Sequence, residues 1–303
     1  MSVFRVSSKD LSVFSSNGDN LTIHALPFTA ICGIILYQII FTEDFFLLDW
    51  MRTDPLGFFS FMIYRAPAVL IALTLHELAH GYVAYLCGDT TARDMGRLSL
   101  NPFRHLDLVG TIMMFTVGMG WAKPVPVNPY RYRKGVRDDF LVSIAGVTVN
   151  FILFVLSTFL TVVIARSLIA DNYAAYYGYR FFLSFEDNGF WALLSNDREL
   201  LSEIVKTPWL LHLARFLFQF ALCNLGACLF NLLPFPPLDG FHVFNDILLK
   251  GRIRLTRQTF QYSMIALFLL MNVTDVFSNL ISSAINAIQS GTLTVFLQLF
   301  GLS

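Results

Sequence analysis

The sequence predicts an all-α polytopic membrane protein of about six transmembrane helices, with short extended or β segments near its candidate functional site. Three observations predict this class. The 303-residue chain is 55% hydrophobic and 14% charged, with 31 phenylalanines, which is more apolar than a soluble domain. Its apolar residues gather in runs of roughly the ~20 residues that cross a bilayer. Between two of these runs, closely spaced prolines exclude helix and favour extended backbone.

The candidate spans follow one another along the chain. The predicted apolar segments are 21–41, 58–87, a short or partly extended 106–119, 140–165, 209–233 and 260–277, with an amphipathic or seventh apolar segment at 279–300. We therefore expect three parts. These are a polar, Ser-rich tail at 1–20, a membrane domain at 21–277 and a C-terminal apolar or amphipathic segment at 278–303.

Three polar segments lie between the predicted spans. In "GRLSLNP" (96–102), the alternation over 97–100 predicts a short strand. In "GWAKPVPVNP" (120–129), each proline removes a backbone donor and fixes an extended backbone, so a loop is expected there. The stretch 166–208 is polar and aromatic, and has room for a small extramembrane helix or two.

The second apolar run carries the ionisable residues His76, Glu77 and His80 in its middle, as "HELAH". Helical positions i and i+4 share a face, so the two histidines can offer imidazole nitrogens to one zinc ion. Glu77 is rotated by about 100° from His76 and can reach a water on that ion. Ionisable residues inside membrane runs are functional candidates. The pattern is typical of a zinc hydrolase.

A zinc site of this kind needs a third protein ligand and an open position for water. Asp239 is the strongest candidate, because it follows the prolines of "NLLPFPPLDG" (231–240), which end the fifth run, and precedes a glycine that allows a tight turn. The alternative is that Asp239 has no metal-binding role and is a loop carboxylate at the membrane interface. His105 and His242 compete for the third place, but each is placed more naturally at the membrane edge.

These motifs together resemble the site-2 protease family of intramembrane zinc metalloproteases. The resemblance rests on "HELAH" and "NLLPFPPLDG", with "GRLSLNP", "GWAKPVPVNP" and an Ala-Gly-x-x-x-Asn element at 145–150. It extends over about residues 60–245. Val147 departs from the pattern, since relatives often carry proline there, and the local bend of that helix is therefore open.

The resemblance implies a site, an activity and partners. It implies one zinc per chain bound by His76, His80 and Asp239, with Glu77 as the general base and Asn150 holding the substrate carbonyl or its oxyanion. The implied activity is hydrolysis of peptide bonds within or near transmembrane segments of membrane proteins, as in regulated intramembrane proteolysis. The implied partners are a transmembrane protein substrate and the lipid bilayer. A regulatory membrane protein is a further candidate.

Basic residues in the short loops indicate the orientation of the chain. The loops 88–106, 121–139 and 250–257 hold 3, 5 and 4 Lys and Arg residues, whereas 42–57 holds one and 166–208 holds 4 among six acids. The more basic loops are expected to face the cytoplasm. His80 then lies ~10 Å beneath that end of its helix. We expect a multi-pass protein of the cell (inner) membrane with its active site toward the cytoplasm.

Other functions are weighed against this one. The net charge is zero and basic residues fall in short clusters, which does not support nucleic-acid binding. The four cysteines lie in or beside apolar runs and are expected to be free thiols.

A zinc transporter would distribute its ligands along a pathway and would not need Glu77. A catalytically silent binding protein would be expected to lack one member of the site. Another membrane zinc protease class is the nearest enzyme alternative, and the Leu-Asp-Gly ligand argues against it.

Overall fold

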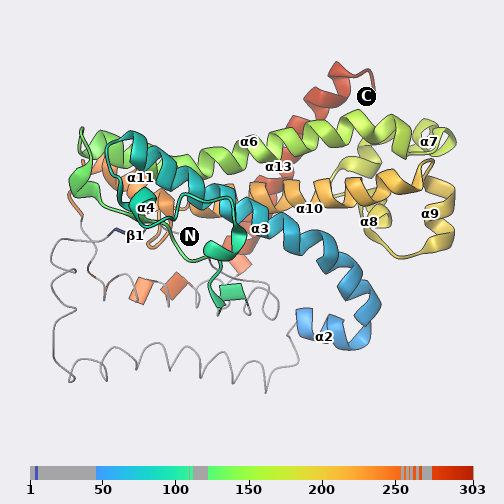
Figure 1. The fold of residues 1–303 in the computed structure, drawn as a ribbon. Coiled ribbons are helices and arrows are strands. Elements are labelled where there is room, and N and C mark those ends of the chain that lie inside the picture. The colour runs from blue at the N-terminus through green and yellow to red at the C-terminus, as the bar shows by residue number, and fades with distance from the viewer. Residues whose placement is uncertain are drawn as a thin grey trace. The chain divides into compact units, whose positions relative to one another are not determined.

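The computed structural model of the protein describes residues 4–5, 46–108, 110–111, 122–253, 256, 259, 262–263, 266–267 and 275–302. The chain divides into two compact units, and each is described by itself. The first unit comprises Met1–Thr53, Leu73–Val147 and Asn231–Asp275, and the second comprises Asp54–Ala72, Thr148–Phe230 and Val276–Ser303. Figure 1 labels the helices and strands.

The first unit combines helix ends with extended segments. Its elements are α2 (Phe46–Thr53), the second half of α3 (Pro55–Leu86), α4 (Thr91–Asp94), the 3-10 helices η2 (Pro102–Arg104) and η3 (Pro129–Arg131), the start of α6 (Val136–Leu168) and α11 (Asp239–Leu248). Strand β1 (Phe4–Arg5) pairs in parallel with β2 (Pro126–Val127). Residues 123–128 form an extended segment that contains β2. The small core of this unit joins the end of α3, this extended segment, the residue after η3 and the start of α6 through Ala84, Cys87, Val127, Tyr132 and Val142.

The second unit is helical and has a large apolar core. It contains the first half of α3, the rest of α6, and α7 (Asp171–Leu183), α8 (Asn188–Leu194), α9 (Arg198–Ile204), α10 (Pro208–Asn231) and α13 (Asp275–Leu299). In Figure 1 α10 lies alongside the C-terminal part of α6, and side chains from both enter one core with α7, α8 and α13. The largest fully buried members of that core include Phe154, Phe182, Phe190 and Phe218.

Four helices in the described part of the chain are long and apolar enough to cross a membrane: Pro55–Leu86, Val136–Leu168, Pro208–Asn231 and Asn279–Leu299. With 32 residues, α3 is about 48 Å long, more than the ~30 Å of a hydrocarbon core. Large apolar side chains on these helices are exposed, including Ile63 at 67% and Val295 at 61%. The protein is therefore a multi-pass helical membrane protein.

Several predicted elements are confirmed. The runs 58–87, 140–165 and 209–233 correspond to α3, α6 and α10, and the C-terminal segment forms the long helix α13. The stretch 166–208 holds three short helices, α7 to α9, where one or two were expected. The predicted spans 21–41, most of 106–119 and much of 260–277 lie outside the described residues. A total of six spans therefore stays a prediction.

The prediction of a strand at 97–100 is wrong. This segment is irregular and belongs to no strand. Arg97 uses its guanidinium to donate to two carbonyls of the extended segment, at 2.9 and 3.2 Å, and the Ser99 carbonyl lies 2.7 Å from His105 Nε2. The N–H groups of Arg97 and Ser99 donate to the nearby carbonyls of Ala92 and Arg97, at 2.8 and 3.0 Å, in place of a strand ladder. The neighbouring prolines do exclude helix over 122–128, as expected.

Candidate metal centre

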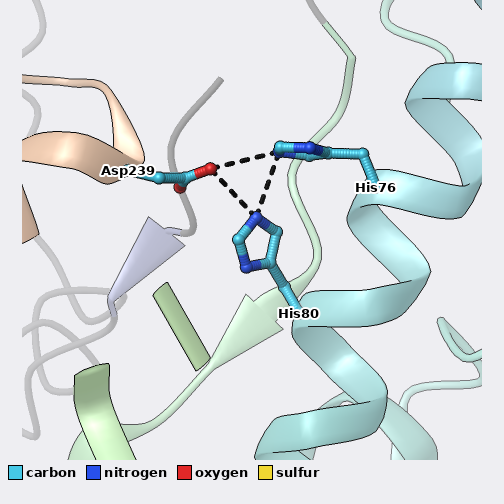
Figure 2. A group of neighbouring side chains, drawn as sticks. All are labelled: His76, His80 and Asp239. Carbon is cyan, nitrogen blue, oxygen red and sulfur yellow. Dashed lines mark hydrogen bonds and ion pairs between the residues drawn. The ribbon is translucent and has the colours of Figure 1, made fainter. Parts of the chain in front are cut away.

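Two helices supply three polar side chains that converge in the first unit. His76 and His80 lie one turn apart on α3, and Asp239 is the first residue of α11. The prolines before Leu238 prevent an earlier helix start, and Leu238 itself is extended, with φ −75° and ψ 157°. The three side chains are buried, with exposures of 1%, 0% and 1% for His76, His80 and Asp239. Figure 2 shows that they point toward one another.

The three facing atoms form a nearly equilateral triangle. His76 Nε2 lies 3.1 Å from His80 Nε2 and 3.2 Å from Asp239 Oδ2, and His80 Nε2 lies 3.1 Å from the same oxygen. A tetrahedral zinc ion with bonds of about 2.0–2.1 Å separates its ligand atoms by about 3.3 Å. The spacing fits that requirement, and these residues form a group that could hold a metal ion.

Hydrogen bonding elsewhere on the His80 ring explains why a cation suits this triangle. His80 Nδ1 lies 2.6 Å from the carbonyl oxygen of Val142. A carbonyl oxygen only accepts, so the neutral ring carries its proton on Nδ1 and Nε2 is left as an acceptor. Nε2 therefore presents a lone pair to a carboxylate oxygen of Asp239. A metal ion held between these two acceptors would make the contact favourable, and a backbone carbonyl behind a ligating histidine is the usual arrangement.

Two buried carboxylate oxygens also fit a metal site. Asp239 Oδ1 and Glu77 Oε1 have no hydrogen-bond partner among the described residues. Such atoms are uncommon in protein interiors, because their desolvation is uncompensated. An ion at the triangle, with water beside it, would give both oxygens partners. Imidazole nitrogens and a carboxylate form a donor set that zinc accepts.

Glu77 is fully buried beside His76 and is held by the extended segment. Its Oε2 accepts a hydrogen bond from the backbone N–H of Val125 at 2.8 Å. Val125 stands between Pro124 and Pro126, neither of which has an N–H to donate. One carboxylate oxygen is thus fixed by the backbone, and the other stays available for proton transfer.

Gly146 is a site residue that the sequence reasoning did not single out. A Cβ atom at this position of α6 would lie 2.4 Å from His80 Nε2 and 2.6 Å from His76 Cε1. Only glycine lets the helix approach both imidazole rings so closely. The signal in the sequence was the Ala-Gly-x-x-x-Asn element, in which Gly146 stands four residues before Asn150.

The other candidates from the sequence lie outside the triangle. His105 contacts the Ser99 carbonyl, and burial lowers the pKa of its imidazole. His242 lies on α11 and is not part of the metal-ligand group found among the described residues. Asn150 is fully buried on α6 and belongs to the second unit. Its role at the site stays a prediction.

Comparison with known proteins places these residues in a family. The family model of peptidase family M50 matches residues 64–273. The chain is 35% identical over 242 residues to "Putative zinc metalloprotease YwhC" of Bacillus subtilis, an alignment covering 80% of this chain and 94% of that protein. It is 26% identical over 230 residues to "Putative zinc metalloprotease Rip2" of Mycobacterium tuberculosis, covering 74% of this chain and 73% of that protein.

A shorter match of 29% identity over 121 residues, 38% of this chain and 47% of the relative, is found with "Putative zinc metalloprotease Rip2" of Mycolicibacterium smegmatis. No solved structure matches the chain significantly. The family match covers well over half of the chain and includes "HELAH" and the Leu-Asp-Gly sequence. The protein therefore belongs to peptidase family M50 and is a membrane zinc metalloprotease of the site-2 type.

Proposed function

We propose that this protease hydrolyses peptide bonds within or near transmembrane segments of membrane-protein substrates, in regulated intramembrane proteolysis. The observation that carries the proposal is the buried group of His76, His80 and Asp239 with Glu77 beside it. Both histidines and Glu77 lie on α3, a helix apolar and long enough to cross a membrane. Ionisable groups are expensive in such a helix. Their burial suits substrates that reach the site within the bilayer.

The roles we propose follow from the contacts. His76 Nε2, His80 Nε2 and Asp239 Oδ2 bind one zinc ion per chain. When bound, zinc acts as a Lewis acid that acidifies water and polarises a carbonyl. Glu77 takes the proton of the attacking water on Oε1, because Oε2 is engaged by Val125, and later gives it to the leaving amine.

Asn150 is proposed to stabilise the oxyanion. It lies one helical turn after Gly146 on α6, so the two positions share a helix face. A donor amide placed at a developing oxyanion typically contributes about 3–4 kcal/mol. This role is supported by the helix spacing and by the burial of the side chain.

Substrates must expose their peptide groups to be cleaved, because a helix engages them in its own hydrogen bonds. We propose that the substrate is presented as an extended strand along the segment that contains β2. The pairing of β2 with β1 supports this, since it shows that the edge of β2 accepts an extended chain. Substrate spans weakened by Gly, Pro or Asn would unwind most readily. Strand addition would then fix the scissile bond by backbone pairing.

The proposed location is the cell (inner) membrane, with the site toward the cytoplasm and residues 21–277 forming the protease domain. The lipid bilayer and a transmembrane substrate are the proposed partners, with a regulatory membrane protein as a third. The basic loops support this orientation.

The test of function compares wild-type protein with Glu77→Gln. Quantitative proteomics on cells with either form should identify membrane proteins whose fragments appear only with the wild type. Purified wild-type protein in proteoliposomes should cleave these candidates, and Glu77→Gln should not. Equal fragment patterns in both cell lines and no cleavage by the purified wild type would refute the proposed activity.

A further inference from the structure

We infer that Asp89 is a positioning residue for Glu77: it anchors the extended segment 123–128 so that the Val125 N–H meets the Glu77 carboxylate. The geometry is independent of any reaction. The predicted effect on cleavage rests on the proposed function of Glu77.

Asp89 stands at the turn that ends α3. Gly88 adopts φ +108°, and a Cβ there would lie 3.2 Å from the Arg131 carbonyl oxygen, so glycine allows the turn to pack against the end of η3. The Asp89 N–H donates to the Ala84 carbonyl at 2.9 Å. The side chain of Asp89 is thereby directed into the unit and is fully buried.

The Asp89 carboxylate receives donors from two different segments. Oδ2 accepts from the backbone N–H of Asn128 at 2.6 Å. Oδ1 accepts from the backbone N–H of Thr91 at 3.0 Å and from the Thr91 hydroxyl. A buried carboxylate is tolerated when hydrogen bonds compensate its lost hydration. Asp89 therefore ties the extended segment to the end of α3.

A second buried carboxylate, that of Glu77, holds the same segment at Val125, three residues before Asn128. Val125 donates to Glu77 Oε2 at 2.8 Å, and Glu77 lies on α3 itself. Because Pro124 and Pro126 lack an N–H, Val125 supplies the one backbone donor in this tripeptide. Glu77 on α3 and Asp89 in the turn that ends α3 thus hold the extended segment at two points, Val125 and Asn128.

This double attachment makes the direction of Glu77 depend on Asp89. The Val125 N–H holds one oxygen of Glu77, and the position of that N–H depends on where the strand lies. Arg97 fixes the strand before Val125 through the carbonyls of Lys123 and Pro124. Asp89 fixes it after Val125, so the loss of Asp89 should let Val125 move away from Glu77.

A purely local role for Asp89 makes a different prediction. Its bond to the Thr91 N–H could serve only to start helix α4, and then Val125 would not respond to its removal. Asp94 provides a matched control. It is an exposed acid of the same short helix and accepts from the Thr90 hydroxyl at 2.6 Å.

The first test measures amide hydrogen exchange in the full-length protein in lipid nanodiscs, for wild type, Asp89→Asn, Asp89→Ala and Asp94→Asn. Both Asp89 variants should speed exchange at Asn128 and at Val125, while the amides of 77–86 stay protected and zinc content is unchanged. Asp94→Asn should match the wild type. Faster exchange at Asn128 alone, or loss of protection throughout α3, would overturn the inference.

The second test measures cleavage of a single-span membrane protein with a Gly-Pro pair in its span. Asp89→Asn should lower kcat by about 10- to 100-fold, the scale of a misplaced catalytic group, with KM unchanged. In a Glu77→Gln background it should lower residual cleavage no further, because both residues act through one carboxylate. An additive loss, or wild-type kcat in Asp89→Asn, would overturn the inference. If the wild type cleaves nothing, the proposed function fails, and the exchange experiment still decides the role of Asp89.

Discussion

His80 Nδ1 lies 2.6 Å from the carbonyl oxygen of Val142, and this contact settles which ring nitrogen can bind a metal. The carbonyl requires a donor, so Nε2 carries the lone pair that faces Asp239 at 3.1 Å. Helix α6 therefore orients a residue of α3. Gly146, on the next turn of the same helix, lies against the rings of both histidines.

The zinc content of the protein should depend on the three converging side chains. We expect one zinc per chain in the wild type and little or none in His76→Ala, because two remaining ligands bind weakly. His212→Ala is the control, since this exposed histidine of α10 contacts Tyr64 and is not in the metal-ligand group. Metal analysis of the purified proteins measures both. Full zinc occupancy in His76→Ala would show that the ion binds elsewhere.

Glu77→Gln should separate metal binding from catalysis. The amide keeps the size of the side chain and can still accept from the Val125 N–H, so fold and zinc content should be unchanged. Cleavage should fall by a factor of about 10² or more, because the general base is removed. Glu203→Gln, an exposed acid paired with Tyr173, should cleave at the wild-type rate. A normal rate in Glu77→Gln would assign the base to another residue.

Gly146→Ala should disturb the metal site through packing alone. The added methyl would lie 2.4 Å from His80 Nε2, so either the ring or α6 must shift. We expect weaker zinc binding and at least a tenfold loss of cleavage, by analogy with other misplaced catalytic groups. Titration with a competing chelator measures the first effect.

Gly226→Ala is the control for this substitution. Gly226 is also a helical glycine, but the nearest atom to its added Cβ is Ile285 Cδ1 at 3.9 Å. Alanine favours helix over glycine, so this variant should bind zinc and cleave as the wild type does. An equal loss in both variants would mean that flexibility of the helices, and not the approach to His80, explains the effect.

The sequence was sufficient to predict the three long helices α3, α6 and α10. The three residues expected to bind zinc form the group that could hold a metal ion. Ionisable side chains at i and i+4 in an apolar run indicate metal binding, because local helix geometry places both on one face. Asp239 is 159 residues from His80, so its place came from the resemblance and from the helix-ending prolines. The sequence cannot measure such a distance.

Tertiary contacts account for what the sequence did not predict. The strand expected at 97–100 does not form because its backbone groups have local partners: the Ser99 N–H donates to the Arg97 carbonyl, and the Ser99 carbonyl contacts the His105 ring. The bonds from Val125 to Glu77 and from Asn128 to Asp89 join residues 48 and 39 positions apart. Neither has a periodic signature. Gly146 was visible as a motif residue, but its contact with two imidazole rings depends on how α6 meets α3 in the first unit.

The depth of the site should decide where a substrate is cut. His80 lies six residues before the end of α3 at Leu86, or about 9 Å along the helix. The loop that follows α3 and the segment before α6 are both basic, which favours the cytoplasmic side for this end. We therefore expect the cut in the cytoplasmic half of the substrate span, with a fragment released to the cytoplasm.

Two measurements check this orientation and the site of cleavage. Lys134→Cys and Arg198→Cys each place a thiol at an exposed position, before α6 and in α9 respectively. A membrane-impermeant maleimide applied to intact cells should label Arg198→Cys and not Lys134→Cys, because α6 crosses the membrane between them. Mass spectrometry of the products should place the new terminus in the cytoplasmic half of the span. The reverse labelling pattern, or a cut in the outer half, would contradict the proposed access from the cytoplasm, because the polar residues at 76–80 would then open to the other side.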